Sequence, residues 1–351
     1  MLTIIMHALL KKLYNRNVYR KNYKDEVISY VHRKKIFIGL NIVITAVVLA
    51  LGFSLHARLM HKDPEVNAFQ QAEANSIQYP FLAKRLFLEE PNDPKINFAP
   101  LRQQIGPYFT NNGVRGSLYF EYLPTGTSVR YNGDKEYRGA SLFKIPVAME
   151  LYKAAELGKV NLDQKVKIKE EHLDSNFGEL YKKGAGYELT LREATKIMLS
   201  DSDNTALFTV AGNIEGKLEQ KDNVFNSLDV SATTVSDQGM DIGSRSYSSF
   251  LKCLYFSCYN TKNDSQEMLK YLTETKYETR LAAGVDDKNV KVAHKIGVFN
   301  TQIQSDCGII YLLKKNYVLC IMLEGQDDKT TNDHIAELSR LVYRYVNNDA
   351  N

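Results

Sequence analysis

The sequence predicts an α/β domain of the α+β type, with one antiparallel sheet flanked by helices and an all-helical subdomain beside it. The first observation is a pair of strand-like segments near residue 120, Gly116–Tyr122 and Ser128–Tyr131, joined by a Pro-Thr-Gly turn. The second is a set of three strand-like segments near the C-terminus. These are Val290–Ile296, Gln302–Leu313 and Tyr317–Leu323. Strands at both ends with helices between them indicate that the terminal strands share one sheet.

Helix-like segments, with apolar residues near helical spacing, lie between and beside those strands. They are Leu101–Phe109, Ser141–Leu157, Leu189–Met198, Ser246–Tyr259 and Asp333–Tyr345.

The chain of 351 residues divides into four predicted parts. Residues 1–35 form a basic cytoplasmic segment, 36–55 a transmembrane helix, 56–99 a proline-containing extracytoplasmic tether and 100–347 the folded domain. Residues 36–55 carry no charge, and a helix of about 20 apolar residues spans the roughly 30 Å hydrocarbon core. Because Lys and Arg crowd the segment before this span, we expect the N-terminus inside and the domain outside the cytoplasmic membrane, as a single-pass signal-anchor.

Charge and cysteine content exclude two classes of function. The net charge of +4 is concentrated in the first 35 residues, so the rest of the chain offers no basic surface for nucleic acid. The cysteines form no C-x-x-C pair, so neither a metal nor a cofactor is expected. An exported domain can form disulfides, but we interpret all the cysteines as small buried apolar residues. They are Cys253, Cys258, Cys307 and Cys320.

Three short motifs, taken together and in their order along the chain, indicate a candidate nucleophile. Ser141-Leu-Phe-Lys144 opens a predicted helix, so serine and lysine share a face three residues apart. Ser202-Asp203-Asn204 follows, and Lys295-Ile296-Gly297 lies on a predicted strand. Ser249-Phe-Leu-Lys252 also fits S-x-x-K, but no such set follows it. We therefore take Ser141 as the candidate nucleophile.

With these motifs, residues 101–346 resemble the class A β-lactamase family of active-site-serine enzymes. Further matching stretches carry the resemblance. They are Tyr137–Lys144, Leu189–Glu193, Met198–Ala206, Arg280–Gly284 and Asp306–Ile310.

The resemblance implies a catalytic role for Ser141, Lys144 and Ser202. Ser141 would attack a carbonyl and form an acyl-enzyme, while a neutral Lys144 takes its proton. Ser202 would relay a proton toward the leaving nitrogen.

The resemblance also implies a set of substrate-binding groups. Asn204 would bind the substrate amide, and Lys295 would attract the substrate carboxylate and favour a neutral Lys144. Gly297 would let the backbone approach the substrate. The N–H groups of Ser141 and Val298 would form the oxyanion hole.

The sequence departs from that family at three points. No E-x-x-L-N, whose glutamate activates the deacylating water, lies between the second and third motifs, where Asp237 and Asp241 are the nearest substitutes. Ile296 replaces a hydroxyl residue that would bind the substrate carboxylate. Cys307 stands where many penicillinases have an arginine. Acylation machinery is thus complete and deacylation machinery is not.

We therefore expect a membrane-anchored active-site-serine hydrolase of β-lactamase type, acylated on Ser141 by β-lactam or related amide substrates. The alternatives are a penicillin-binding-type D-alanyl-D-alanine peptidase acting on cell-wall peptides and a non-hydrolytic acyl-trapping or sensory module. The expected partner is a small-molecule β-lactam or a cell-wall peptide, with a monomeric catalytic domain.

Overall fold

The computed structural model describes residues 12, 45–49, 96–233, 235–236, 239–300, 302–325 and 327–348. The chain divides into two compact units, Met1–Gln71 and Ala72–Asn351, and the second carries every element discussed below. The predicted cytoplasmic segment, membrane span and tether fall almost entirely outside the described residues. Within the described residues, no helix has the length and apolar content needed to cross a membrane.

A five-stranded antiparallel sheet is built from both ends of the domain, as the sequence predicts. Its strand order is β2-β1-β10-β9-β8. The strands are β1 (Gly116–Tyr122), β2 (Thr127–Tyr131), β8 (Lys291–Phe299), β9 (Ile303–Tyr311) and β10 (Tyr317–Glu324). Because β1 pairs with β10 from Gly116↔Leu323 to Tyr122↔Tyr317, the first and last strands of the sheet meet at its centre.

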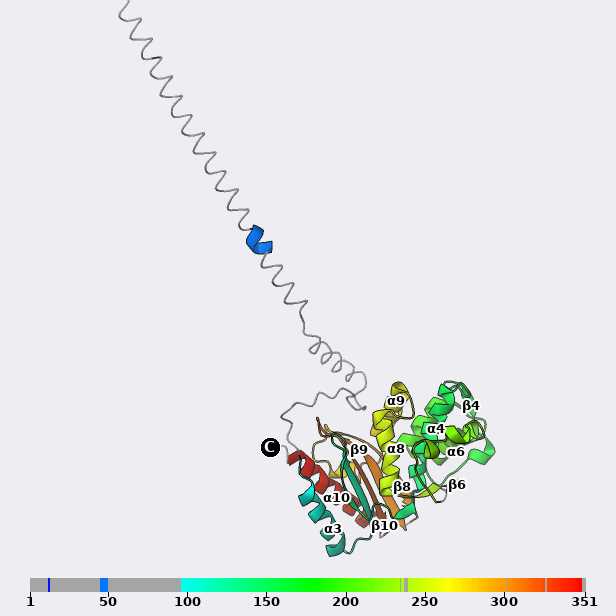
Figure 1. The fold of residues 1–351 in the computed structure, drawn as a ribbon. Helices are drawn as coiled ribbons and strands as arrows, with labels where there is room; N and C mark the ends of the chain where they lie inside the picture. The colour runs from blue at the N-terminus through cyan, green and yellow to red at the C-terminus, as the bar shows by residue number, and fades with distance from the viewer. Residues whose placement is uncertain are drawn as a thin grey trace, which may run out of the picture. The chain divides into compact units, whose positions relative to one another are not determined.

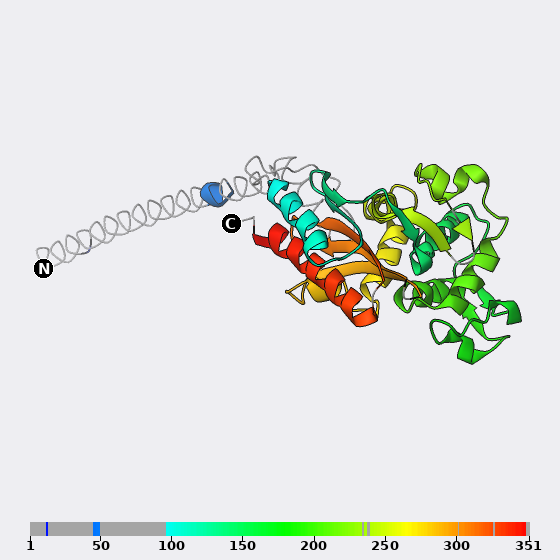
Figure 2. The same cartoon turned by 90° about the horizontal axis from the view of Figure 1, so that it is seen from below.

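Helices cover both faces of this sheet. Figures 1 and 2 show α3 (Ala99–Asn111) and α10 (Asp328–Asn348) together on one face, with α8 (Ser244–Phe256) on the other. Every residue of β1 is buried accordingly, which explains why its sequence lacks the polar alternation of a half-exposed strand. The domain therefore has two apolar cores, one on each side of the sheet.

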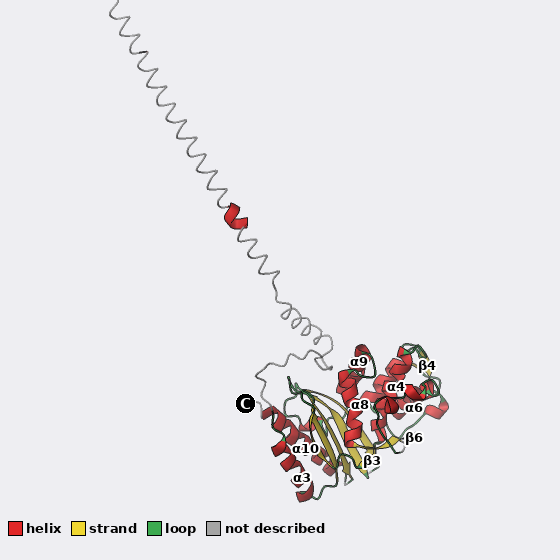
Figure 3. Cartoon of the chain, in the orientation of Figure 1, coloured by secondary structure: helices red, strands yellow, loops and turns green. Residues whose placement is uncertain are grey.

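The helical region beyond α8 carries the middle of the chain, and Figure 3 shows it as mostly helix. Its helices are α4 (Lys144–Glu156), α5 (Leu191–Ser200), α6 (Asn204–Ile214), α7 (Val224–Ser227) and α9 (Lys262–Thr273). Two small sheets accompany them. They contain β3 (Glu136–Arg138), β7 (Gly239–Gly243) and β6 (Val235–Ser236) in that order, and β4 (Lys165–Lys167) with β5 (Glu188–Thr190).

Cys253, Cys307 and Cys320 are buried as expected and Cys258 is exposed, but treating the cysteines as simple apolar residues is wrong, because the structure contains two disulfides, Cys253–Cys258 and Cys307–Cys320. Helix α8 ends before Cys258, and Ser257 adopts a left-handed conformation with φ of 51°. This turn brings Cys258 back toward Cys253, which a continuous helix would prevent. The other pair lies directly across the β9–β10 ladder, a juxtaposition that only the strand register decides.

Candidate active site

The candidate nucleophile Ser141 lies in a tight turn rather than in the α-helix that the sequence predicts. A 3₁₀ helix, η1 (Ala140–Phe143), carries it, and α4 begins only at Lys144. Ala140, the preceding residue, has a φ of 46°, a conformation that non-glycine residues rarely adopt. Strained backbone of this kind is concentrated at functional sites. The turn still places Ser141 and Lys144 on one face.

The second motif lies in the turn between α5 and α6. Ser202 is fully buried and has a φ of 58°, so its backbone is also left-handed. Asp203 holds this turn, since its carboxylate accepts hydrogen bonds from Ala206 N and Leu180 N, each at 2.8 Å. A β-carbon at Gly178 would lie 2.1 Å from this carboxylate, so the loop before α6 needs a glycine there. Asp203 is thus the cap of α6 and a structural anchor of the site.

The amine of Lys144 is the centre of the site. Its Nζ lies 3.0 Å from Ser141 Oγ and 3.3 Å from Ser202 Oγ. It also lies 2.5 Å from the carbonyl oxygen of Ser202 and 2.7 Å from Asn204 Oδ1. Four of the residues predicted from the motifs therefore meet around one fully buried nitrogen.

Burial decides the protonation state of this amine. Desolvation lowers the pKa of Lys144 to about 7, although the carboxylates of Asp203 and Asp174 oppose the shift. A neutral amine has two N–H donors and one lone pair. The carbonyl of Ser202 and the amide oxygen of Asn204 can only accept, so they take the two hydrogens. The lone pair is then left for a hydroxyl proton, and Ser141 Oγ at 3.0 Å lies closer to it than Ser202 Oγ at 3.3 Å, which is the geometry a general base for Ser141 needs.

Lys295 brings the third motif to the same place. It lies on β8, is fully buried, and its Nζ donates to Ser202 Oγ at 2.6 Å and to the Ile296 carbonyl at 3.1 Å. Burial, followed by repulsion from Lys144, holds the pKa of Lys295 well below its usual range. Ser202 Oγ therefore bridges the two lysines, as a proton relay requires.

Gly297 has a structural role beside the substrate approach that the sequence predicts for it. A β-carbon at Gly297 would lie only 2.4 Å from the Gly139 carbonyl oxygen, so its immediate role is to let β8 pack against the turn before Ser141. Val298 follows on the same strand, in register with Gln304. This packing brings the predicted oxyanion donors, the N–H groups of Ser141 and Val298, onto neighbouring segments.

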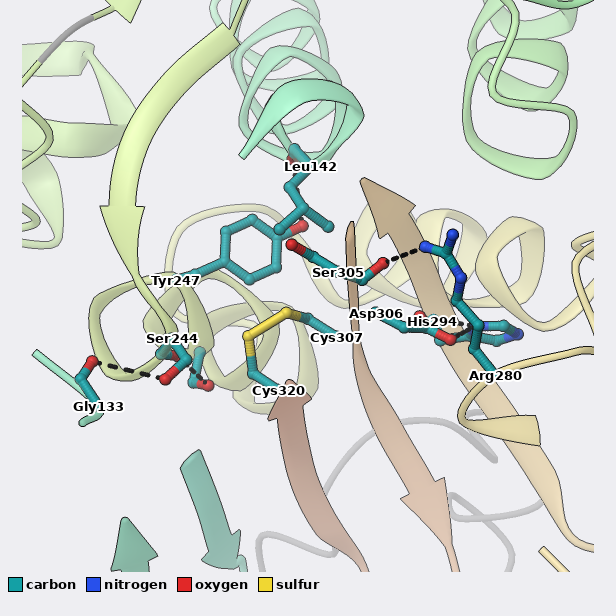
Figure 4. Close-up of a disulfide and its surroundings, with 11 residues drawn as sticks. Gly133, Leu142, Ser244, Tyr247, Arg280, His294, Ser305, Asp306, Cys307 and Cys320 are labelled. Atoms are coloured by element: carbon teal, nitrogen blue, oxygen red, sulfur yellow. Dashed lines mark hydrogen bonds and ion pairs between the residues drawn. A yellow bond between two sulfur atoms is a disulfide. The ribbon is translucent and has the colours of Figure 1, made fainter. Parts of the chain in front are cut away.

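Arg280 is a site residue that the motif search missed. It is buried, and its guanidinium donates to the carbonyl oxygen of Ser305 at 2.7 Å (Figure 4). The guanidinium also donates to the carbonyl oxygen of Gly297 at 3.4 Å. It also contributes to the lowered pKa of Lys295, so its positive charge lies close to that lysine. The sequence held a signal, since Arg280 opens one of the matching stretches, but only the fold brings it beneath β8.

A buried carboxylate fixes the segment that presents Arg280. Asp306 on β9 lies 2.9 Å from His294 Nδ1 on β8 (Figure 4). It also accepts a hydrogen bond from Leu281 N at 3.0 Å. It thereby ties the backbone next to Arg280 to the residue next to Lys295. A buried carboxylate with several hydrogen bonds fixes such an arrangement more firmly than apolar contact alone.

Tyr247 connects the nucleophile turn to the apolar core that contains the Cys307–Cys320 disulfide. Figure 4 shows Tyr247 of α8 beside this disulfide, with its hydroxyl directed at the turn that contains Leu142. Tyr247 OH donates to the Leu142 carbonyl at 3.1 Å and is completely buried. Cys307 therefore contributes to packing beneath the site.

The mouth of the site is formed by a loop without a recognisable motif. Asp174 accepts a hydrogen bond from Asn204 Nδ2 at 3.1 Å, and the Phe177 carbonyl accepts from Asn204 N at 3.0 Å. The ring of Phe177 lies 5.9 Å from Lys144 Nζ and packs beside Tyr277. These residues were missed because they hold no fixed spacing to the serine motifs.

Three other residues were named from the sequence: Lys252, Asp241 and Asp237. Lys252 of the second S-x-x-K donates to Glu121 at 2.8 Å, so its amine is engaged by a carboxylate rather than by Ser249. Asp241, named as a substitute for the missing glutamate, forms an ion pair with Arg138 at 2.6 Å. Asp237 lies outside the described residues.

The fold and the serine–lysine cluster define an active-site-serine hydrolase, and comparisons with known proteins agree. The profile of the β-lactamase enzyme family matches residues 100–346. The chain belongs to the β-lactamase enzyme family. It is therefore a serine β-lactamase-like hydrolase.

Individual relatives are distant. A protein from Bacteroides uniformis named β-lactamase is 23% identical over 243 residues, which cover 62% of this chain and 82% of the relative. The solved structure of PBP-A is similar with a TM-score of 0.65 at 22% identity, covering 72% of this chain and 97% of PBP-A. A β-lactamase from Chitinophaga pinensis has a TM-score of 0.63 at 22% identity, covering 70% and 98% of the two chains. These structures share the fold.

The pKa of about 7 for Lys144 predicts the pH dependence of Ser141 reactivity. Lysine is a base only when neutral, so labelling of Ser141 by a fluorophosphonate should be maximal above pH 7. Below it, the rate should fall about tenfold per pH unit as the neutral fraction falls. Lys144→Arg should lose most of this reactivity at every pH, because a guanidinium stays protonated.

Labelling rates measured across this pH range, with circular dichroism to check the fold of each variant, test the assignment. A rate that stays constant through pH 7, or a reactive Lys144→Arg variant, would show that the proton goes elsewhere.

Proposed function

We propose that this chain is an exported, membrane-anchored hydrolase that β-lactams or related amides acylate on Ser141. The single observation that carries the proposal is the buried Lys144 amine, which lies 3.0 Å from Ser141 Oγ while the Ser202 carbonyl and Asn204 Oδ1 accept its hydrogens. Among the relatives, a variant of PBP-A is recorded as an acyl-enzyme complex with penicillin G, which supports the same chemistry for this chain.

The acylation step follows from the contacts. Ser141 Oγ bonds to the lactam carbonyl carbon while its proton passes to Lys144 Nζ. The tetrahedral oxyanion accepts hydrogen bonds from the backbone N–H groups of Ser141 and Val298. Its collapse breaks the C–N bond, and the leaving nitrogen receives a proton through Ser202 Oγ, which lies 3.3 Å from Lys144 Nζ. Lys144 returns to the neutral state once it has released its proton along this route.

The charge of the site favours an anionic substrate. Lys295 lies within hydrogen-bond reach of Ser202, and Arg280 lies on the neighbouring carbonyls of Gly297 and Ser305. These cations stand in for the hydroxyl absent at Ile296 and for the arginine absent at Cys307. A substrate carboxylate at the start of α6 and the end of β8 would gain from both, as in β-lactams and in peptides with a free C-terminus.

Deacylation separates the β-lactamase from the alternatives. In hydrolysis, a water oxygen bonds to the ester carbonyl carbon while a base accepts the water proton. The bond between that carbon and Ser141 Oγ then breaks. The family glutamate is absent and Asp241 is bound to Arg138. We therefore propose slow deacylation. This is compatible with a weak β-lactamase, with a penicillin-binding-type D-alanyl-D-alanine peptidase, or with an acyl-trapping module.

Location outside the cytoplasm is supported by two independent features. The uncharged residues 36–55 follow a basic segment, and the domain contains two disulfides, which persist in oxidising compartments. We propose an N-terminus inside, one membrane-spanning helix and the hydrolase domain outside.

The nucleophile assignment predicts which serine is labelled. A fluorescent penicillin should label the wild-type protein but not Ser141→Ala, because the hydroxyl that forms the ester is gone. Ser249→Ala is the matched control, since it removes the serine of the second S-x-x-K motif and should label at the wild-type rate. In-gel fluorescence after equal exposure measures both. Undiminished labelling of Ser141→Ala would rule the assignment out.

The absence of the glutamate predicts a persistent acyl-enzyme. General-base assistance accelerates a step by about 10²–10⁴-fold, so its loss should leave the penicilloyl adduct on Ser141 as the main species after a burst. Intact-mass spectra recorded over time after mixing with penicillin G measure the adduct. Rapid turnover without an adduct would show an efficient β-lactamase, and Asp237→Asn would then test the second of the two carboxylates that the sequence offers in place of the glutamate.

The anchor proposal predicts protease sensitivity in whole cells. A protease added outside intact protoplasts should digest the hydrolase domain and leave a short N-terminal fragment. An epitope tag before residue 36 should remain protected until the membrane is permeabilised. Immunoblots against the tag and the domain measure both, and a domain protected in intact protoplasts would contradict the topology.

A further inference from the structure

The loop that covers the site carries a half-buried carboxylate, Asp174, next to the substrate-binding amide. Its Oδ1 accepts hydrogen bonds from Asn204 Nδ2 at 3.1 Å and from Asn176 N at 2.8 Å. Its Oδ2 accepts from Asn176 Nδ2 at 3.0 Å. Thr205 Oγ1 holds the backbone of Asp174 through both its N–H and its carbonyl. The carboxylate is therefore firmly oriented although no catalytic motif contains it.

The charge of this carboxylate is not neutralised by its neighbours. Within the described residues, Asp174 is held by neutral amide donors and forms no ion pair. Burial raises the pKa of its carboxyl, but these hydrogen bonds together outweigh that effect and leave the pKa lowered. The nearby cation is Lys144, and the proposed mechanism needs that amine neutral. While Lys144 is neutral, before Ser141 gives up its proton, Asp174 is thus an uncompensated, half-exposed negative charge when the substrate arrives.

The contact with Asn204 places this charge beside a particular part of the substrate. Asn204 Nδ2 has two hydrogens, and Asp174 takes one. The other remains for the carbonyl of the substrate side-chain amide. Two hydrogen bonds of about 3 Å diverging by about 120° put their acceptors about 5 Å apart. The atom attached to that carbonyl, the α-carbon of the acyl side chain, then lies within reach of Asp174.

We propose that Asp174 is a specificity-determining residue that selects acyl side chains bearing an ammonium or other cationic group next to the amide, and that disfavours carboxylates there. The inference rests on the proposed function and adds the substrate class to it. The site would then bind a substrate with two opposite charges, an anionic group near Lys295 and a cationic group near Asp174. A zwitterionic acyl donor, such as a peptide or penicillin with a free amine, fits that pattern.

Three penicillins test this, because they share one scaffold and differ at the α-carbon. Ampicillin carries an ammonium there, penicillin G a hydrogen and carbenicillin a carboxylate. Acylation rates should be measured on the full chain at a pH where the ampicillin amine is protonated. A charge pair about 5 Å apart at a partly hydrated site changes the rate roughly tenfold. We expect ampicillin to react roughly tenfold faster than penicillin G, and carbenicillin roughly tenfold slower.

The variants isolate the charge from the fold. Asp174→Asn keeps the acceptor for Asn204 and removes the charge, so the three rates should converge. Any general damage to the site affects all three penicillins alike and cancels in their ratios. Asp174→Glu should retain the order. Glu179→Gln is the matched control, because it removes a charge from the same loop where the carboxylate binds only Lys182, and it should keep the wild-type ratios.

The outcomes separate this inference from the proposed function. Equal rates for the three penicillins in the wild type, or unchanged ratios in Asp174→Asn, overturn the role of Asp174 while acylation itself stands. If none of the three acylates Ser141, the proposed function fails and the inference fails with it.

Discussion

The site depends on one costly arrangement, a lysine amine buried without a carboxylate in direct contact. An isolated ammonium in an apolar interior is far less stable than in water, so Lys144 responds by losing its proton more readily. The acceptors around it then determine the direction of its lone pair. Ser202 and Asn204 supply those acceptors, and Ser202 supplies one through a carbonyl that its left-handed backbone directs at the amine. The strained backbone at this residue is thus part of the chemistry.

A second constraint is that the site is shared between segments distant in sequence. Lys295 must reach Ser202 from an edge strand, and Gly297 must pass close to the turn before Ser141. Neither contact is local, so the position of β8 must be fixed from outside the site. Asp306 and Arg280 fix it from one side of the strand, and the Cys307–Cys320 pair holds the adjacent strand. The sequence departs from the family at Ile296 and Cys307. In this structure Arg280 binds the backbone carbonyls of Gly297 and Ser305, and Cys307 forms a disulfide.

The site also has an asymmetric charge distribution that the motifs do not express. Lys144, Lys295 and Arg280 are buried together, while Asp174 lies at the mouth. Asp203, although buried beside them, uses both carboxylate oxygens on backbone N–H groups and serves the fold. These two carboxylates near the site thus have separate tasks: Asp203 holds the turn, and Asp174 is partly exposed to solvent. This distinction depends on which hydrogen-bond donors surround each of them.

The sequence by itself determined the fold class and named Ser141 and Lys144 as the candidate nucleophile and base, because strand and helix periodicity and the i, i+3 spacing of these two residues are local properties. It also determined the order of the motifs, which distinguished Ser141 from Ser249. Only the tertiary structure decided the cysteine pairing, since Cys258 returns through a left-handed residue and Cys307 meets Cys320 through strand register. The same holds for Arg280 and Asp174. Their roles come from contacts between segments far apart in the chain, and no spacing in a single sequence encodes such contacts.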